Sequence, residues 1–412
     1  MTVAAAVAAV RAEMTDVLVE LVRTPSVTGE EAAAQRLVEQ VLDGLDLTVD
    51  SWCPQRADLE QHASFSDDEL PLGERPVVVG RWVVGEGPST ILNGHIDVVP
   101  VGELHRWPHD PWAGAIEHGV LWGRGACDMK GGLVAGITAV AALQRAGLRP
   151  TGDVLVQSVI GEETGGAGTL ATLLRGHAAD AAVVLEPTRL AICPVGAGAA
   201  SFRLHVSGRA AHGAMRLEGA SAIDAYVVLH EALHRLEHER RATFTHPAFD
   251  AGALVAPISV GRLTAGDWPS TVPERLVAEG RHGVLPGESL DEARQALEAA
   301  VAAVAAESGG EPVVEWFEGQ FAPAATPVDH PFLARLAACH EQVTGARPAV
   351  HGVPYGSDLR FFTNDLGVPA VLYGPGDVAV AHTVDEHVVL DEVFRAAEVV
   401  ANLLVGADLA DA

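Results

Sequence analysis

Basic residues are scarce in this chain of 412 residues, and Lys130 is the only lysine. The chain has 27 lysines and arginines against 55 aspartates and glutamates, which gives a formal net charge of −28 at pH 7. Because nucleic acids and anionic membranes attract positively charged proteins, this balance argues against either as a partner. With 48% hydrophobic and 20% charged residues, the rest of the composition is typical of a globular protein that can bury a core.

Cysteines and long uncharged runs are also scarce. Cys53, Cys127, Cys193 and Cys339 are scattered without a C-x-x-C pair, which predicts free thiols in a reducing compartment. The first apolar run, VAAAVAAV, is short and leads directly into charged residues, so it indicates an amphipathic helix and not a signal peptide. No later run is long and uncharged enough to cross a bilayer. We therefore expect a cytoplasmic location.

Helical and strand-like segments alternate in the first part of the chain. Helical spacing over residues 32–42 is followed by strand-like runs at 77–84 and 90–93, and residues 154–160 are almost continuously apolar. Such runs are typical of strands buried on both faces of a parallel sheet. A polar stretch from about residue 58 to 76 suggests a surface excursion. This pattern predicts an α/β fold with a mostly parallel sheet.

The pattern changes after Gly196, where SFRLHVSG alternates like a half-exposed strand. The segments that follow have the order β-α-β-β-α-β, which predicts a compact antiparallel sheet with helices on one face. The α/β alternation resumes near residue 330. We therefore predict an α/β domain formed by residues 1–195 and 321–412, interrupted by an inserted α+β domain at residues 196–320.

Polar groups with metal-binding chemistry lie at or near the ends of the strand-like runs. They are His95, Asp97, Asp128, Glu162, Glu163, Glu186 and His382. In an open α/β sheet, ligands bind outside the carboxyl ends of the strands, so these groups can converge at one edge. Each motif alone is weak, but several charged groups at the ends of buried strands are costly without a cation or partner. Two histidines with several carboxylates suit a pair of divalent zinc-like ions.

A site for two ions needs one carboxylate that bridges them. Asp128 is the candidate, because it lies in a glycine-rich turn that lets the backbone come close to the metals. His95 and Glu186 would complete the site of one ion, and Glu163 and His382 that of the other. We expect zinc, with cobalt or manganese as substitutes.

Two further carboxylates are expected to support the chemistry. Asp97 would orient and polarise the His95 ring. Glu162 and Glu163 are consecutive, so their side chains should diverge at the strand end and only one of them should bind metal. We assign Glu162 as the general base, which would take a proton from metal-bound water and deliver it to the leaving amine.

These motifs resemble those of the zinc aminoacylase and carboxypeptidase family, which includes acetylornithine deacetylase, succinyl-diaminopimelate desuccinylase and glutamate carboxypeptidase. The resemblance runs from TPSVTGEE to AHTVDE and is carried by NGHIDVVP, GRGACDMKGG, GEETGG and LEPT. It places the family's metal ligands on the five residues assigned above, its general base on Glu162 and its supporting aspartate on Asp97.

The resemblance also implies that residues 1–195 and 321–412 form the catalytic domain, and that the inserted domain at residues 196–320 is a lid through which a homodimer forms. GRAAHGAM places His212 at the family's lid histidine, which reaches the partner subunit's active site and helps to stabilise the oxyanion. Ser221 and Arg262 depart from the family pattern, so lid contacts with substrate cannot be carried over. GSDLRFF resembles a substrate-side turn, in which Asp358 precedes Arg360; this arginine could pair with a substrate carboxylate or form a structural salt bridge.

The expected function is that of a metal-dependent amidohydrolase in which metal-bound hydroxide attacks an N-acyl amide. GPGD before AHTVDE favours an acetylornithine deacetylase-like enzyme acting on a small N-acyl amino acid or N-acyl diamine, with acetyl, succinyl or formyl as the acyl group. The alternatives are a dipeptidase or carboxypeptidase of the same family, and a catalytically silent metal-binding dimeric scaffold. The presence of Glu162 argues against a silent protein.

Overall fold

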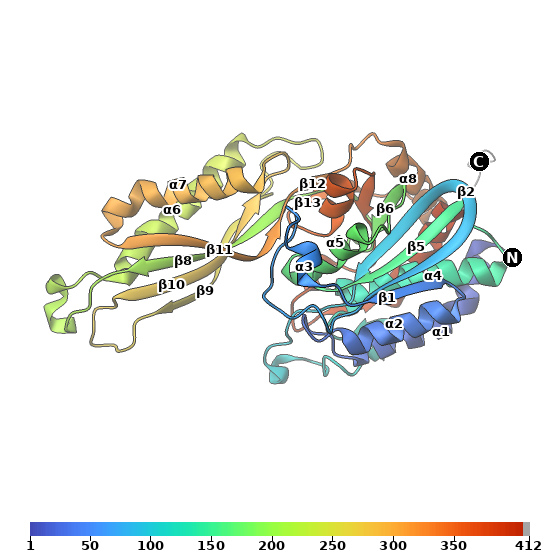
Figure 1. Ribbon diagram of the computed structural model, residues 1–412, viewed down its shortest axis with the longest axis horizontal. Helices are drawn as coiled ribbons and strands as arrows, with labels where there is room; N and C mark the ends of the chain where they lie inside the picture. The colour runs from blue at the N-terminus through green and yellow to red at the C-terminus, as the bar shows by residue number, and fades with distance from the viewer. Residues whose placement is uncertain (407–412) are drawn as a thin grey trace.

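Two lobes of unequal size make up the protein (Figure 1). The computed structural model describes residues 1–406. The larger lobe holds the sheet formed by β1 (Thr48–Trp52), β2 (Val77–His95), β5 (Gly152–Val159), β6 (Ala181–Val184), β7 (Ile192–Gly196), β12 (Ala324–Ala325), β13 (Val350–Val353) and β14 (Ala370–Leu372). A small second sheet in this lobe contains β3 (Ala115–Glu117), β4 (Val120–Trp122) and β15 (His387–Val389).

Strand β2 has two arms, and β5 lies between them. Val78 to Trp82 pair with Ser158 to Val154 in antiparallel register, whereas Thr90 to His95 pair with Val154 to Val159 in parallel register. The two strands expected at 77–84 and 90–93 are therefore the arms of one long, folded-over strand. The second arm continues in parallel to β6, which is in turn parallel to β14. This parallel core directs the ends of the second arm, β5 and β6 to the same edge of the sheet.

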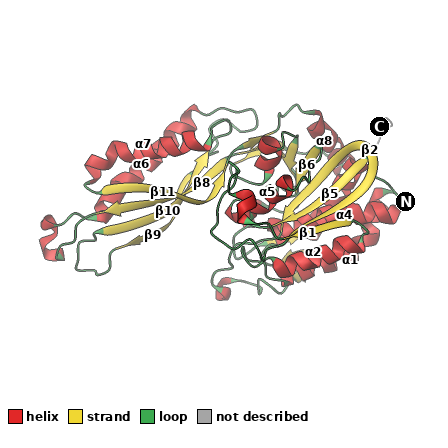
Figure 2. Cartoon of the chain, viewed as in Figure 1, coloured by secondary structure: helices red, strands yellow, loops and turns green. Residues whose placement is uncertain are grey.

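Helices pack around the central sheet in this lobe (Figure 2). They are α1 (Val3–Arg23), α2 (Ala32–Gly44), α3 (Arg56–Leu59), α4 (Gly131–Ala146), α5 (Ala167–Leu174), α8 (Pro331–Thr344) and α9 (Leu390–Val405). Helix α4 packs against α1, α9 and β2, and all of its residues from Gly131 to Leu143 are buried. Gly132 permits the closest approach, because a Cβ there would lie 1.8 Å from the carbonyl oxygen of Leu185.

The segment Ala126–Ala146, which ends with α4, has a length and a mean hydropathy of 1.4 that would allow a membrane span. The segment is not an uncharged run, because it contains Asp128, Lys130 and Arg145, and it is no clear membrane span. In the structure, 94% of the apolar window is buried inside the protein, where it forms part of the hydrophobic core.

The smaller lobe is an antiparallel sheet with two helices. Its strands, in the order β11-β8-β10-β9, are β11 (Glu311–Phe321), β8 (Gly198–Ser207), β10 (Arg275–Val284) and β9 (Ile258–Ala265), and its helices are α6 (Ala222–Thr243) and α7 (Leu290–Ser308). The helices pack against each other and on the sheet, around a separate cluster that includes Phe202, Leu229 and Leu297. The predicted fold class, a mainly parallel α/β sheet with a separate antiparallel sheet, is confirmed. The domain boundaries at 195/196 and 320/321 stay a prediction.

The expected surface excursion at residues 58–76 contains a buried ion cluster. Arg75 is 1% exposed and donates to both carboxylate oxygens of Glu31, at 2.9 and 2.6 Å. It also donates to Asp68 at 3.0 Å, and Asp68 accepts a hydrogen bond from Thr164 in the turn after β5. The polar sequence suggested exposure, but mutual neutralisation of these groups permits their burial. This segment therefore supports the turn that contains Glu162.

We predict that Arg75→Ala lowers the free energy of unfolding by about 3–5 kcal/mol, because it leaves a buried carboxylate without its partner. Arg81→Ala is the matched control, since Arg81 pairs with Asp153 at the surface and such pairs contribute roughly 0–1 kcal/mol. Chemical denaturation of both variants measures the difference. Equal losses would contradict the role assigned to the buried cluster.

Candidate metal centre

His95 ends the second arm of β2 and is fully buried. Its Nδ1 lies 2.9 Å from the backbone carbonyl oxygen of Asp97, so an Nδ1–H would donate there and fix the ring. Its Nε2 then points to the open end of the sheet, 3.0 Å from Asp128 Oδ1 and 3.9 Å from Glu186 Oε1. An orienting contact on one nitrogen and carboxylates near the other are typical of a histidine that binds metal.

The Asp97 carboxylate has a wider role than the sequence suggested. It lies 3.7 Å from His95 Nδ1, which is longer than a hydrogen bond. Its two oxygens accept hydrogen bonds from the backbone N–H groups of Glu162 (3.1 Å) and Glu163 (3.2 Å), and from Thr28 Oγ1 (3.1 Å). Asp97 therefore holds the Glu162–Glu163 turn in place, and it orients His95 chiefly through its backbone carbonyl.

Asp128 lies between the two histidines of the centre. Its Oδ1 is 3.0 Å from His95 Nε2, and its Oδ2 is 3.4 Å from His382 Nε2. The His382 nitrogen also lies 3.1 Å from each carboxylate oxygen of Glu163. A carboxylate that directs one oxygen to each histidine has the geometry needed to contact two neighbouring ions.

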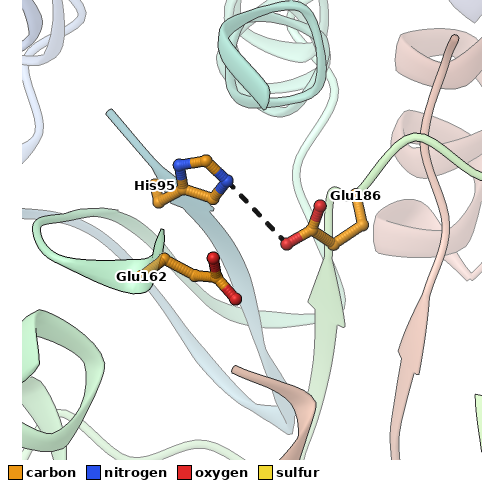
Figure 3. Close-up of side chains that lie close together, drawn as sticks. All are labelled: His95, Glu162 and Glu186. Atoms are coloured by element: carbon orange, nitrogen blue, oxygen red, sulfur yellow. Dashed lines mark ion pairs between the residues drawn. The ribbon is translucent and has the colours of Figure 1, made fainter. Parts of the chain in front are cut away.

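Glu162 and Glu186 complete the buried side of the cluster. Figure 3 shows their carboxylates directed toward the same space as the His95 ring. Ligand atoms of His95, Glu162 and Glu186 lie within 4.8 Å of one another, and so do those of His95, Asp128 and Glu163. Glu162 is 7% exposed and Glu186 5% exposed. The structure thus brings all seven strand-end residues together at one edge of the sheet.

Burial and mutual repulsion control the protonation of these groups. Burial raises the pKa of Glu162 well above its usual range, and the neighbouring Glu186 carboxylate adds to this effect. Hydrogen bonds with Asp128 and Glu163 raise the pKa of His382 to about 10. Burial also raises the pKa of Glu163, and Asp128 raises it further. Carboxylates crowded in this way bind protons when their negative charge is not balanced, and divalent cations balance it more completely than two histidines do.

The donor set fits a pair of divalent ions. Imidazole nitrogens and carboxylate oxygens are ligands that zinc, cobalt and manganese share. Two ions with Asp128 between them would have His95 and Glu186 on one side and Glu163 and His382 on the other. Glu162 is close to the cluster but is not needed to complete either set.

Glu386 is a supporting residue that the sequence analysis missed. It is 1% exposed, and its Oε1 accepts hydrogen bonds from the backbone N–H groups of Cys127 (3.2 Å) and Asp128 (3.1 Å). It also forms a buried ion pair with Arg124. The sequence shows that Glu386 lies four residues after His382 in AHTVDE. No local sequence pattern, however, predicts its hydrogen bond to the backbone of Cys127, which lies more than 250 residues earlier in the chain. Glu386 fixes the turn that carries Asp128.

Three predicted site residues lie outside the cluster. Arg360 is buried and donates to the carbonyl oxygens of Gly165 (2.6 Å) and Ser64 (3.1 Å). Asp358 accepts a hydrogen bond from Thr169 at 2.6 Å, and burial raises its pKa to about 6. Arg360 thus supports the GEETGG loop and Asp358 the helix α5 that follows it, and a contact with substrate stays a prediction for each.

His212 lies in the smaller lobe, apart from the metal centre of its own chain. It is exposed and precedes a short helical turn, where its Nδ1 accepts a hydrogen bond from Ala214 N at 3.2 Å. A backbone bridge joins it to Thr271. In this conformation His212 is too far from the metal centre of its own chain to act there. A catalytic role for His212 therefore requires a different site.

Comparison with known proteins identifies the family. The sequence model of peptidase family M20/M25/M40 matches residues 91–405, and the chain belongs to this family. It is therefore a hydrolase of a metal-dependent family that acts on amide bonds. The chain is 29% identical over 353 residues to N-formyl-4-amino-5-aminomethyl-2-methylpyrimidine deformylase of Bacillus subtilis, with 77% of this chain and 79% of that protein covered. The Halalkalibacterium halodurans deformylase of the same name is 28% identical over 396 residues, with 90% and 88% covered.

A succinyl-diaminopimelate desuccinylase of Cereibacter sphaeroides is 36% identical over 182 residues, which cover 42% of each chain. Among solved structures, human carnosine dipeptidase 1 has a TM-score of 0.77 at 17% identity, with 98% of both chains covered. The Bacillus subtilis protein YXEP, described as a dinuclear metal binding peptidase, has a TM-score of 0.66 at 17% identity, with 96% of this chain and 98% of that chain covered. These two likenesses show that the fold is shared.

We predict that Asp128→Ala weakens binding of both ions, whereas His382→Ala weakens chiefly one. The reason is that Asp128 directs an oxygen to each histidine, while His382 lies beside Glu163 on one side only. Metal content per subunit, measured after dialysis against a series of buffered zinc concentrations, separates the two patterns. An Asp128→Ala variant that still binds two ions with wild-type affinity would show that Asp128 does not bridge.

Proposed function

We propose that this protein is a dinuclear metal amidohydrolase that removes an acyl group from a small N-acyl amine. The observation that carries the proposal is the position of Asp128 between His95 and His382, with the buried Glu162 carboxylate beside the same cluster. The proposed ligands are His95, Asp128, Glu163, Glu186 and His382. Two zinc ions are the expected occupants, with cobalt or manganese as substitutes.

Divalent ions in such a site act as Lewis acids and make a water acidic enough to lose a proton near neutral pH. The chain's own groups then handle that proton. Glu162 accepts it at a carboxylate oxygen when the water attacks the acyl carbon, and donates it to the amine nitrogen as the C–N bond breaks. Asp97 keeps Glu162 in position through the backbone N–H groups of the turn.

The relatives favour a formyl or succinyl group over acetyl. Two relatives that are covered over most of their length carry a deformylase name, and a third, covered over less than half, carries a desuccinylase name. The acetylornithine deacetylase-like specificity expected from GPGD before AHTVDE remains an alternative. Hydrolysis of matched N-formyl, N-succinyl and N-acetyl derivatives of one amine tests the acyl preference, and aminopyrimidine and amino acid series test the amine.

A dipeptidase is the second candidate, since human carnosine dipeptidase 1 shares the fold over nearly the whole chain. Dipeptides included in the same panel distinguish it from a deacylase. A catalytically silent metal-binding scaffold would bind the ions but turn over none of these compounds.

We also propose that residues 196–320 form a lid through which two chains dimerise in the cytoplasm. Strand β9 pairs only with β10 among the described residues, so one of its edges is open. Next to this edge, Ile223 and Val227 on α6 and Leu263 on β9 are exposed. An open strand edge with apolar neighbours favours pairing with another chain. In such a dimer the His212 turn would reach the partner's metal centre and donate to the developing oxyanion.

We expect Glu162→Gln to keep the fold and the bound metal and to lose most activity. Glutamine fills the same volume but cannot take up the proton, and general acid–base groups typically contribute about 10²–10⁴-fold in rate. The measurement is kcat on the best substrate of the panel, together with metal content and thermal unfolding. A variant that retains more than about half of wild-type kcat would remove Glu162 from this role.

Mixing two inactive variants should restore activity if His212 acts across the dimer. One parent carries His212→Ala with an intact metal centre, and the other carries Glu162→Gln with an intact lid. Random exchange places about half of the chains in mixed dimers, each with one complete site, so roughly a quarter of wild-type activity is expected. Absence of recovery after verified subunit exchange would mean that His212 acts in its own chain or has no catalytic role.

A further inference from the structure

Helix α6 carries a row of histidines on the outside of the smaller lobe. His230, His234 and His238 are spaced by four residues, so they follow one another along one side of the helix. His234 and His238 are exposed and His230 is half-buried. The helix belongs to the antiparallel lobe, away from the sheet edge that holds the metal centre (Figure 1). The row therefore has no part in the site described above.

Two of these histidines converge on one point. The Nε2 atoms of His230 and His234 lie 3.1 Å apart, and the two rings meet edge to face. Zinc binds imidazole nitrogens at about 2.0–2.1 Å, so two nitrogens at a tetrahedral angle on one ion lie about 3.3–3.4 Å apart. The observed separation is thus close to the separation that chelation requires. Only a small rotation of the exposed His234 ring is needed to reach it.

His230 is held by a group that leaves its coordinating nitrogen free. Its ring stacks on Tyr226, with centroids 5.4 Å apart, and its Nδ1 lies 3.3 Å from the Tyr226 hydroxyl oxygen. When Nδ1–H donates to this oxygen, the lone pair of the ring lies on Nε2, which faces His234. Histidine ligands are commonly oriented by such a contact on the second nitrogen. Burial lowers the pKa of His230, and His234 lowers it further, so the uncharged form that can bind metal is favoured.

A simpler explanation of the geometry is a single hydrogen bond between two neutral rings. That bond uses one N–H and one lone pair, and it does not require Tyr226 to orient His230. Pairs of histidines four residues apart on a helix bind zinc when the nitrogens on one face are free. The stack on Tyr226 and the separation of the Nε2 atoms together favour the chelating arrangement.

We propose that His230 and His234 form a second metal site, on α6 of the lid, for a divalent transition ion such as zinc, nickel or copper. Imidazole is a ligand that these ions share. In the single chain the His234 side of the site is open to solvent, so water completes the coordination there. The same face of α6 carries Val227, so in the dimer proposed above this side lies next to the partner chain. On binding, the ion replaces the hydrogen bond between the rings, and the proton of the donating ring moves through solvent from Nε2 to Nδ1, so that both histidines bind the ion as neutral imidazoles.

Zinc binding to the full-length protein tests this site. The metal centre is first filled, and equilibrium dialysis against increasing free zinc then measures further uptake per subunit. Wild type should bind one additional ion, and His230→Ala and His234→Ala should each weaken this binding at least tenfold. Tyr226→Phe should weaken it about tenfold, because loss of a group that orients a metal-binding histidine typically costs about 10–100-fold in affinity.

His238→Ala is the matched control, since His238 lies on the same helix but forms neither a hydrogen bond nor a ring contact with the pair. It should bind the additional ion like wild type. The proposal is wrong if wild type takes up no more zinc than His234→Ala, or if His238→Ala loses as much binding as His234→Ala. Thermal unfolding of the metal-free variants establishes that each one is folded.

Discussion

Concentrated negative charge at the carboxyl edge of the central sheet is the constraint on which the rest of the larger lobe depends. Asp97, Asp128, Glu162, Glu163 and Glu186 lie within or beside one cluster, and the structure surrounds them with buried basic groups. Those basic residues are Arg75, Arg124, Lys130 and Arg360. None of them neutralises a proposed ligand directly. Arg75 and Arg124 pair with other buried acids, whereas Lys130 and Arg360 donate to backbone carbonyls. The ligand carboxylates are thereby left available for cations, while the loops that carry them are fixed.

The sequence predicted much of the centre because strand ends are local features. His95, Glu162 and Glu186 each follow an apolar run, and a parallel sheet brings such ends to one edge. The supporting contacts could not be predicted in this way. Glu386 holds the backbone at Asp128, and Arg75 neutralises Glu31, across long separations in the chain. Such pairings depend on how loops pack, and for this reason the buried ion cluster in the otherwise largely exposed segment at 58–76 was not predicted.

In the smaller lobe, the sequence predicted the secondary structure but not how the lobe contributes to function. Its alternating strands and its helices were predicted from local patterns, and the structure contains them in the expected order. The function of its exposed turn is not visible in a single chain, because His212 contacts only its own neighbourhood. A partner chain can complete the site only if two chains associate. The periodic patterns of a single sequence, which predict helices and strands, do not predict such an association.

The position of β5 between the two arms of β2 restricts the order in which the protein can fold. The two arms do not form a hairpin by pairing with each other, because each arm pairs with β5 instead. The sheet therefore closes only after residues 152–159 have been synthesised and inserted, which makes its formation non-local and comparatively slow. The same insertion pairs His95 with Val159, three residues before Glu162. Insertion of β5 thus brings the end of the second arm into register with the turn that carries Glu162, whereas Glu186 and His382 join the centre only when later parts of the chain have folded.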